Sequence, residues 1–389
     1  MILYNQYNNY MKRVNCAICN SKLENIKIVE NVPIKLTCYS KPIYESSELS
    51  ISKCITCNTI QLDKLIPLNI LYDGSHNYTS YGKVWEKYFD LFVSYIKSIV
   101  INKNILEIGD PSGKIALKLN DYNKWFIVEK NKNDKINFNE KITFIEQFFD
   151  DDFIINHKID IIVHSHLFEH IYEPNKFLEK CYNILNDNGE MFFGVPNMQH
   201  FTETNICPFL GLFFEHTIFL NKENITYLLN KNNFEIIKII DYEKHSTIYH
   251  CKKIIGNNIY NNTNNTNNTN NFTITNYYDN FEKSIVVYNE FLEKCNNIII
   301  NTNKDVYIFG ASYNNQLLIS FGLDMTNVKG FLDNCKEKQG KFLHGYNLKI
   351  YDPNIIKNKD CIIILKNGYY TNEILKQIYE LNINTEVII

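Results

Sequence analysis

The stretch NILEIGDPSGKIALKLN, residues 104–120, decides the fold of the central part of the chain. It begins as an apolar strand, bends at Gly109, and resumes with helical spacing after Gly113. Glycine permits a tight turn at the first position and a close backbone approach to a ligand at the second. Pro111 stands where the middle glycine of a dinucleotide-binding loop is expected. The pattern predicts a ligand-binding loop at the end of the first strand of a parallel sheet.

Strand-like and helix-like segments alternate on both sides of this loop. The expected strands are 104–108, 124–129, 142–145, 159–164, 189–195 and 234–240. The expected helices are 82–99, 113–119, 173–185 and 222–231. Such alternation implies right-handed crossovers and a mainly parallel sheet. The stretches DVYIFGAS, VKGFLDN, YNLKIYD, CIIILKN and TEVII repeat the scheme near the C-terminus, which predicts a second doubly wound α/β domain.

Length and local composition divide the chain into four segments. A chain of 389 residues is too long for one ordinary core. Residues 1–65 hold paired cysteines, and residues 66–250 hold the first α/β segment. Residues 251–277 are rich in Asn and Thr, so we expect a flexible linker or a surface insertion there. Residues 278–389 hold the second α/β segment.

The net charge of −3 gives no electrostatic argument for a nucleic acid or a membrane surface as partner. The chain has no apolar run long enough to span a bilayer, and its N-terminus does not resemble a signal peptide. We therefore expect a cytoplasmic protein, in the host cytoplasm if the bias toward Asn, Ile, Lys and Tyr reflects a viral genome. The 11 cysteines are then expected to be free thiols or metal ligands rather than disulfides.

Two matched cysteine pairs mark the N-terminal segment. Cys16 and Cys19 form one CxxC pair, and Cys54 and Cys57 form the other. Two such turns can present four thiolates to one tetrahedral Zn²⁺ ion. Four thiolates leave no open position for a catalytic water, so the predicted role of the ion is structural. We predict a zinc ribbon-like domain whose small core depends on the metal for much of its folding free energy.

The second strand of the central segment ends in an acidic residue, Glu129, within the stretch WFIVEK. A carboxylate at this place can accept hydrogen bonds from both hydroxyls of a ribose. Glu107, at the end of the first strand, would repel a phosphate, and Pro111 removes one N–H donor from the loop. S-adenosylmethionine (SAM) fits these features, because it carries a cationic amino-acid end and no phosphate.

Several stretches carry a resemblance to a known family. LEIGDPSGKIALKL, FIVEK and DIIVHSHLFEHIYEPNKFLEKCYNILNDNGEMFFGVPNM resemble motifs of class I SAM-dependent methyltransferases. Together with the cysteine pairs and FFEHTIFLNKENITYLL, they are similar to the nucleotide-sugar C-methyltransferase family. The resemblance implies a zinc-binding domain, a Rossmann-like SAM methyltransferase domain and a C-terminal Rossmann-like α/β domain. It also implies SAM and structural Zn²⁺ as cofactors, and a nucleotide-linked sugar as substrate.

The resemblance extends to candidate catalytic residues. Glu215 and His216 match the end of the family's Tyr-His-Glu-His signature, which implies that His216, beside Glu215, is a general base. Phe213 and Phe214 replace the Tyr and the first His of that signature. If the missing phenol is needed for an enolate, C-methylation is in doubt. O-methylation of a sugar hydroxyl needs only one general base, so both reactions stay open.

The cofactor site is expected at the carboxyl ends of the strands, where open α/β sheets bind their ligands. Here His166 and Glu169 are candidates to contact cofactor or substrate, and His170 resembles a superfamily position that orients the loop. The residues expected to bind the cofactor are Glu107, Gly109, Asp110, Gly113, Glu129, His164 and His166.

Two further stretches resemble parts of the family's site. Tyr78 and Tyr81, in HNYTSYGKVWEKY, resemble the segment that closes over the site and are the remaining catalytic candidates. Gly310 to Ser312 and Asp333 resemble a Rossmann loop with its acidic partner, which implies a role in holding the nucleotide-linked sugar. Two alternatives stay open: an NAD(P)-dependent sugar oxidoreductase, or a non-catalytic binding module derived from a methyltransferase.

Overall fold

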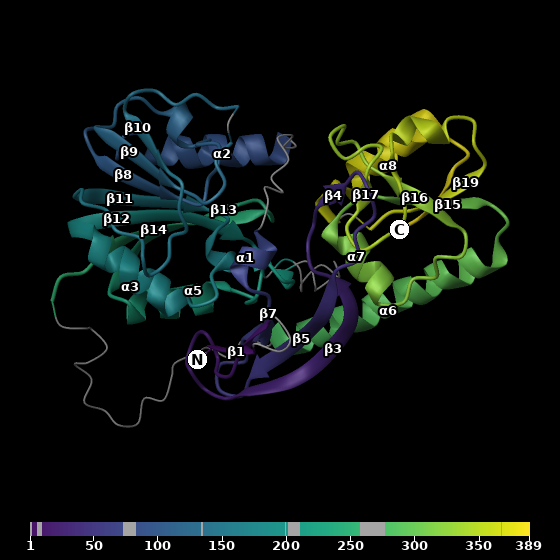
Figure 1. Cartoon of the computed structure of the whole chain (residues 1–389), viewed down its shortest axis with the longest axis horizontal. Helices are drawn as coiled ribbons and strands as arrows, with labels where there is room; N and C mark the ends of the chain where they lie inside the picture. The colour runs from purple at the N-terminus through teal and green to yellow at the C-terminus, as the bar shows by residue number, and fades with distance from the viewer. Residues whose placement is uncertain are drawn as a thin grey trace.

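The computed structural model describes residues 2–5, 10–72, 83–133, 135–198, 200, 211–256, 277–366 and 368–389. Tyr78, Tyr81 and residues 257–276 of the expected linker lie outside these ranges. Two α/β bodies lie side by side, and strands from the N-terminal segment run below and between them (Figure 1). We call these bodies the central domain and the C-terminal domain.

The sheet of the central domain has seven strands in the order β10-β9-β8-β11-β12-β14-β13. β10, β9, β8, β11 and β12 pair in parallel, as predicted. β14 pairs antiparallel with both β12 and β13, so the sheet ends in a hairpin that was not predicted. The strand bounds are β8 (Asn104–Ile108), β9 (Lys124–Val128), β10 (Ile142–Ile145), β11 (Ile159–Ser165), β12 (Leu185–Pro196), β13 (Phe234–Tyr242) and β14 (Ser246–Lys253).

Helices cover both faces of this sheet (Figure 1). The alternation of side chains along a strand sorts the core residues between the faces. Ile105 of β8 packs with residues of α2 (Lys83–Ile96). Leu106, next to it, packs with residues of α3 (Pro174–Ile184) and α5 (Lys222–Lys231) on the opposite face. Loops at the carboxyl end of β8 are thus held between two packed cores.

The C-terminal domain contains an all-parallel sheet of five strands in the order β18-β16-β15-β19-β20, which confirms the second doubly wound domain. Its strands are β15 (Asp305–Phe309), β16 (Val328–Leu332), β18 (Ile350–Tyr351), β19 (Cys361–Ile364) and β20 (Glu386–Ile388). Its helices are α6 (Tyr277–Asn301), α7 (Tyr313–Ser320) and α8 (Thr371–Leu381). Among the described residues, no helix combines the length and the apolarity needed to cross a membrane.

The N-terminal segment is built mainly from strands. β3 (Leu23–Pro33) pairs antiparallel with β5 (Ser46–Cys54), and β5 pairs with β6 (Ile60–Leu62). A second sheet joins β1 (Ile2–Asn5), β2 (Tyr10–Arg13) and β7 (Lys64–Leu65). Apolar residues of β3 and β5 share one core with α6 and α7, so this segment does not rely on a small core of its own.

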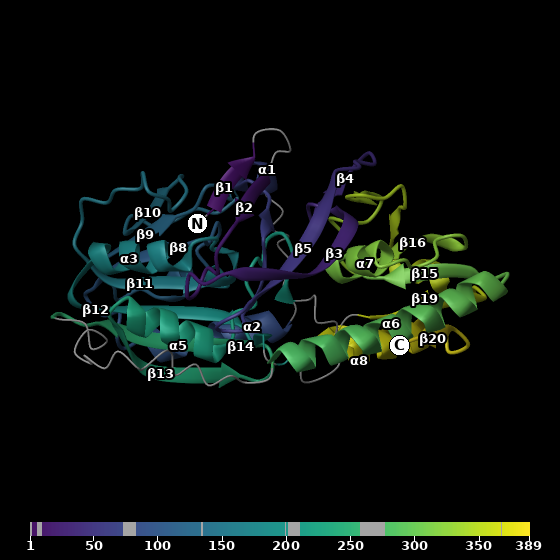
Figure 2. The same cartoon turned by 90° about the horizontal axis from the view of Figure 1, so that it is seen from below.

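The β3–β5 hairpin reaches across to the C-terminal domain, as Figure 2 shows. Near its tip, β4 (Cys38–Tyr39) pairs antiparallel with β17 (Phe342–Leu343). Gln316 of α7 donates to the backbone carbonyl of Lys35 at 3.0 Å. His344 Nε2 bonds with the carbonyl oxygen of Glu45 at 2.9 Å. The hairpin therefore connects the N-terminal segment to the C-terminal domain.

Gly194 of β12 lies against Tyr88 of α2, whose side chain is fully buried. A Cβ atom at Gly194 would lie 1.8 Å from the Tyr88 hydroxyl oxygen, which bonds with Ser165 Oγ at 2.9 Å. We expect Gly194→Ala to lower the free energy of unfolding by about 1–3 kcal/mol, measured by urea denaturation. The second substitution Tyr88→Phe should recover part of the lost stability, because it removes the hydroxyl oxygen nearest to the new Cβ atom. The same loss in the single and double variants would contradict this explanation.

Candidate active site

Two cavities adjoin at the carboxyl ends of β8, β9 and β11. The first, of about 220 Å³, lies within the central domain, and we call it the inner cavity. The second, of about 740 Å³, is lined by residues of both domains, and we call it the interdomain cleft. His166 and His170 line both cavities, so they form the wall between the two.

Two glycines shape the loop after β8. Gly109 lines the inner cavity with φ +83°, and a Cβ atom there would lie 2.9 Å from Leu167 Cδ1. Gly113 has φ +60°, and a Cβ atom there would lie 2.7 Å from the ring of Phe138. Both positions combine a left-handed backbone with a close neighbour, which favours glycine. Gly113 does not line either cavity, so its part in the site is to close the turn.

Glu129 and His166 also line the inner cavity. Glu129 follows β9, is half-buried, and accepts a hydrogen bond from the Asn131 N–H at 3.0 Å. His166 has φ +51°, a left-handed conformation that is uncommon outside glycine. Its N–H donates to the Gly194 carbonyl at 2.8 Å, which holds it in this conformation. Glu129, the residue expected from the sequence to bind a ribose, thus lines the inner cavity together with His166 and His170.

Asp110 closes the loop after β8 with its own carboxylate. It accepts hydrogen bonds from the N–H groups of Ser112 at 2.8 Å and Lys114 at 2.7 Å. The helix predicted over 113–119 is only a 3₁₀ turn, Ala116–Lys118. Because the Asp110 carboxylate already accepts hydrogen bonds from these N–H groups, the loop does not present them to a phosphate. Asp110 therefore braces the loop and does not line either cavity.

Glu107 and His164 are buried behind the cavities. Glu107 accepts hydrogen bonds from the Trp125 indole at 2.8 Å and from the Ala116 N–H. Burial raises the pKa of Glu107 well above its usual value. The His164 ring stacks on Phe193 with centroids 4.8 Å apart, and burial lowers its pKa to about 3, so it is neutral. The structure does not bring these two predicted cofactor ligands to the inner cavity.

Tyr72 lines the inner cavity at the end of α1 (Leu68–Leu71). Its hydroxyl bonds with His170 Nδ1 at 2.9 Å. Burial, followed by the charge of Glu215, raises the pKa of Tyr72 well above its usual value, so the phenol stays protonated. The amino-acid sequence alone does not mark Tyr72 as a site residue, because a chain with 27 tyrosines offers little signal at any one of them.

A chain of hydrogen bonds runs from Tyr72 through His170 to His216. The Nε2 atoms of His170 and His216 lie 3.2 Å apart, and Glu215 Oε2 lies 3.9 Å from His170 Nδ1. Burial, followed by the charges of other histidines, lowers the pKa of His216 well below 6.5. The ring is therefore neutral at neutral pH, with a lone pair able to take a proton.

Phe213 and Phe214 stand where the resembling family has Tyr and His. The Phe213 ring lies 4.2 Å from the His216 ring and 4.2 Å from the Tyr313 ring of the C-terminal domain, between centroids. Phe214 is buried in the core shared by the two domains. The Phe213 contact holds the His216 ring by packing, and the phenol that bonds with His170 comes from Tyr72.

A second polar group lies on the cleft side of the wall. His166 Nδ1 is 3.4 Å from Glu169 Oε1, and His166 Nε2 bonds with Ser246 Oγ at 2.9 Å. Ser246 also bonds with His245 Nδ1 at 2.6 Å. The Trp85 ring packs against both imidazoles, with centroids 4.5 and 4.6 Å away. Ser246 was missed because it begins the unpredicted strand β14.

The C-terminal domain lines the opposite side of the cleft with the loop after β15. Asp333 Oδ2 accepts a hydrogen bond from the Ala311 N–H at 2.9 Å and lies 3.3 Å from Lys338 Nζ. Lys338 also donates to the Ala311 carbonyl at 2.9 Å and lines the cleft. Asp333, which follows β16, thus braces the loop after β15, and its ion-pair partner Lys338 lies on the cleft beside it.

The four predicted zinc ligands meet in space. The Sγ atoms of Cys16, Cys19, Cys54 and Cys57 all lie within 4.8 Å of one another. The separation is 3.4 Å for Cys19 and Cys54, and 3.6 Å for Cys16 and Cys57. Four sulfurs bound at about 2.3 Å to a tetrahedral Zn²⁺ ion would lie about 3.8 Å apart. The cluster is therefore compatible with one zinc ion.

The cysteine cluster is attached to the central domain. Thr59 Oγ1 lies 3.0 Å from Cys57 Sγ and accepts a hydrogen bond from Asn224 of α5 at 2.9 Å. Asn175 of α3 donates to the carbonyl of Ala17, beside Cys16, at 2.8 Å. Partners of this kind orient metal ligands. The cluster thus fixes the N-terminal segment against the two helices that cover the site.

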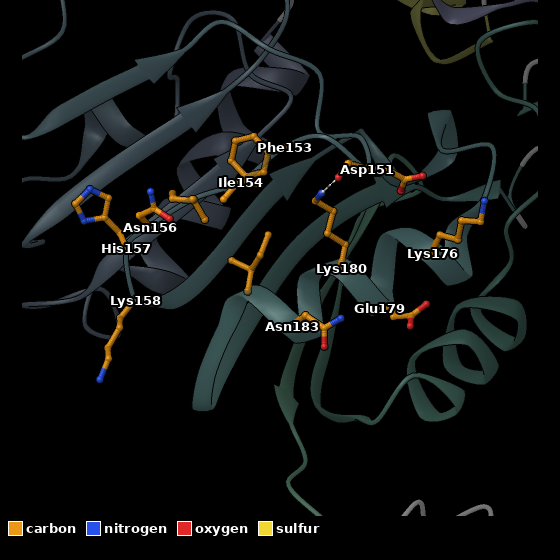
Figure 3. A pocket seen from close by; sticks show the side chains of 12 residues that line it. Asp151, Phe153, Ile154, Asn156, His157, Lys158, Lys176, Glu179, Lys180 and Asn183 are labelled. Carbon is orange, nitrogen blue, oxygen red and sulfur yellow. Dashed lines mark hydrogen bonds between the residues drawn. The ribbon is translucent and has the colours of Figure 1, made fainter.

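A third hollow, of about 780 Å³, is an open groove between α3 and the loop before β11 (Figure 3). Lys180 of α3 donates to the carbonyl oxygens of Asp150 and Asp151 at its edge. None of the described residues that line this groove lines the inner cavity or the interdomain cleft. We assign it no part in the site.

We expect Cys54→Ser to lose most of the bound zinc, because a serine hydroxyl replaces one of four thiolates. Since metal binding adds to folding free energy, the melting temperature should fall as well. Elemental analysis and thermal denaturation would measure both effects. Cys335→Ser, a change to a half-buried cysteine outside the cluster, is the matched control and should keep its zinc. Equal zinc content in the two variants would contradict the assignment.

Comparison with sequence families gives two matches. The family described as "Methyltransferase domain" matches residues 86–239, which include most residues that line the inner cavity and most of the central sheet. The family described as "C-methyltransferase C-terminal domain" matches residues 257–387. A comparison with curated proteins found no match.

Among solved structures, similarity is confined to part of the chain. The N-methyltransferase NodS from Bradyrhizobium japonicum, in complex with S-adenosyl-L-homocysteine, is 12% identical, with 44% of this chain and 88% of that chain covered and a TM-score of 0.34. A magnesium protoporphyrin IX methyltransferase from Synechocystis is 12% identical, with coverages of 46% and 90% and a TM-score of 0.36. The two family matches show a methyltransferase domain followed by a C-methyltransferase C-terminal domain, and they support SAM-dependent methyl transfer as the activity.

Proposed function

We propose that this protein transfers the methyl group of SAM to a nucleotide-linked sugar, or a related glycan precursor, at a carbon or an oxygen atom. The observation that carries the proposal is the shared wall of the two cavities, formed by His166 and His170. A donor in the inner cavity and an acceptor in the cleft would meet at these residues. Methyl transfer needs such contact between the reacting atoms.

The inner cavity suits SAM, which supplies an electrophilic methyl group on a sulfonium. Glu129 would accept hydrogen bonds from the ribose hydroxyls, as its place after β9 allows. The N–H groups of Ser112 and Lys114 are already bonded to Asp110, so this loop offers a poor cradle for a pyrophosphate. That feature disfavours the nicotinamide dinucleotide that an oxidoreductase would need.

The interdomain cleft suits a substrate that is larger than a free sugar. Its volume of about 740 Å³ is within the usual range for a bound small molecule. Lys338 would pair with a phosphate group, and Trp85 and Tyr313 offer aromatic surfaces to a base or a sugar ring. Nucleic acid and membrane are not part of the proposal. The described cysteines are all free, which fits a reaction in the cytoplasm.

His216, with Glu215 beside it, is the proposed general base. Its neutral imidazole would take a proton from a sugar hydroxyl, or from a carbon next to a keto group. The resulting electron pair would form the bond to the methyl carbon as the methyl–sulfur bond breaks and S-adenosylhomocysteine leaves. Tyr72 and His170 orient His216 through their hydrogen bonds. The ring of Phe213 packs on His216 and limits its contact with water. This polar chain at the wall also favours an enzyme over a non-catalytic module.

We expect Glu129→Ala to weaken SAM binding by about 1–3 kcal/mol, because a charge-assisted hydrogen bond to the ribose is lost. Isothermal titration calorimetry would measure the change. Glu146→Ala, an exposed residue after the neighbouring strand β10, is the control and should bind as the wild type does. Unchanged affinity in Glu129→Ala would remove Glu129 from the ribose site.

We expect His216→Ala to lower kcat by about 10²–10⁴-fold while SAM affinity stays unchanged. Because burial lowers the pKa of His216, its base form persists on acidification. The acid limb of kcat/KM in the wild type should therefore lie below pH 6.5. Transfer of a labelled methyl group to pooled nucleotide sugars would measure kcat of the variant and the pH dependence of kcat/KM of the wild type. Turnover within twofold of the wild type would exclude His216 as the base.

A further inference from the structure

Arg13 is the only arginine in a chain with 40 Lys and Arg residues. Its side chain is 2% exposed. Nη1 donates to the carbonyl oxygens of Leu62 at 2.7 Å and Thr217 at 3.0 Å. Nη2 donates to the Tyr172 carbonyl at 3.0 Å and to Thr217 Oγ1 at 3.1 Å. One buried cation thus binds acceptors from three separate segments.

Two of these segments carry His170 and His216. Tyr172 lies just after His170, and Thr217 directly follows His216. Arg13 therefore joins the chain next to each imidazole, close to where their Nε2 atoms meet at 3.2 Å. The Tyr172 hydroxyl also donates to the Phe214 carbonyl at 3.5 Å, so the turn after β11 and the loop before α5 are linked at this point as well.

The N-terminal sheet also binds the His216 loop through its backbone. The Leu62 N–H donates to the Thr217 carbonyl at 2.8 Å. Gln61 forms an isolated antiparallel bridge with Ile218, and its side-chain amide donates to Cys16 Sγ at 3.2 Å. The loop that carries His216 is thus attached to the strand that supports the cysteine cluster. Arg13 lies at the same junction, at the end of β2.

We propose that Arg13 is a positioning residue for methyl transfer, which fixes the separation of His170 and His216 by binding the backbone beside each. The proposal rests on the function proposed for these histidines. A lysine would keep the charge but lose the planar fork that reaches several acceptors at once. Burial lowers the pKa of Arg13 to about 10, so the guanidinium stays charged at neutral pH.

Arg13→Lys is the test variant. We expect kcat to fall by about 10–100-fold through misplacement of the base, while SAM affinity stays within about twofold, because Arg13 does not line the inner cavity. Thr217→Val removes one side-chain acceptor and should have a smaller effect. In a double-mutant cycle the two changes should be non-additive, since they act on one network. Lys12→Met, an exposed neighbour in β2, is the matched control.

Imidazole ¹⁵N NMR gives a readout that does not depend on turnover. The His170 and His216 signals, assigned with His170→Gln and His216→Gln, should shift in Arg13→Lys and stay in place in Lys12→Met. Unshifted signals with wild-type kcat in Arg13→Lys would overturn the proposal. Parallel losses of kcat, SAM affinity and melting temperature would also overturn it, because they would make Arg13 a general stabiliser.

Two further outcomes are informative. If Arg13→Lys does not fold, Thr217→Val alone must shift the imidazole signals, or the proposal fails. If the wild type methylates no nucleotide sugar but the signals still shift in Arg13→Lys, the proposed function is overturned and the structural link between Arg13 and the two histidines is supported.

Discussion

The close approach of His170 and His216 sets the conditions for the rest of the site. Two imidazoles can place nitrogens 3.2 Å apart when one donates an N–H and the other accepts it. Two imidazolium ions at that distance would repel each other. Burial keeps His216 neutral, and the Tyr72 hydroxyl satisfies the other nitrogen of His170. The packing of Phe213 against both His216 and Tyr313 makes that burial depend on the C-terminal domain. The charge state of this histidine pair therefore depends on both domains being assembled.

The two α/β domains brace their glycine loops in a related way. Asp110 binds N–H groups of its own loop, and Asp333 reaches from the next strand to the N–H of Ala311. In both domains a carboxylate accepts hydrogen bonds from backbone N–H groups of the loop. A phosphate-binding loop would keep these N–H groups available for its ligand. In the proposed function, ligand recognition falls to side chains on the cavity walls, such as Glu129 and Lys338. Two similar folds thus form one site without offering two dinucleotide sites.

Local patterns predicted those parts of the structure that depend on short-range order. The apolar runs of β8, β9 and β11 and the two CxxC pairs are visible in the sequence alone. The predicted helix after Gly113 is reduced to the turn Ala116–Lys118, because the backbone is already extended at Leu119, with φ −127° and ψ 150°. Strand alternation places Glu107 on the same face as Ile105, toward the core, and that rule was available from the sequence. The link from Arg13 to Thr217 spans 204 positions, and no local pattern could indicate it.

The β3–β5 hairpin has a consequence for biogenesis. Its contacts with Gln316 and His344 join residues separated by 281 and 299 positions. During synthesis the hairpin emerges early, whereas β17 and α7 emerge near the end. Contacts of such long range slow folding, and unpaired strands are exposed to aggregation while they wait. The nascent chain therefore has a long interval in which the apolar side of the hairpin lacks its partners, and shielding by chaperones would matter most for this N-terminal part.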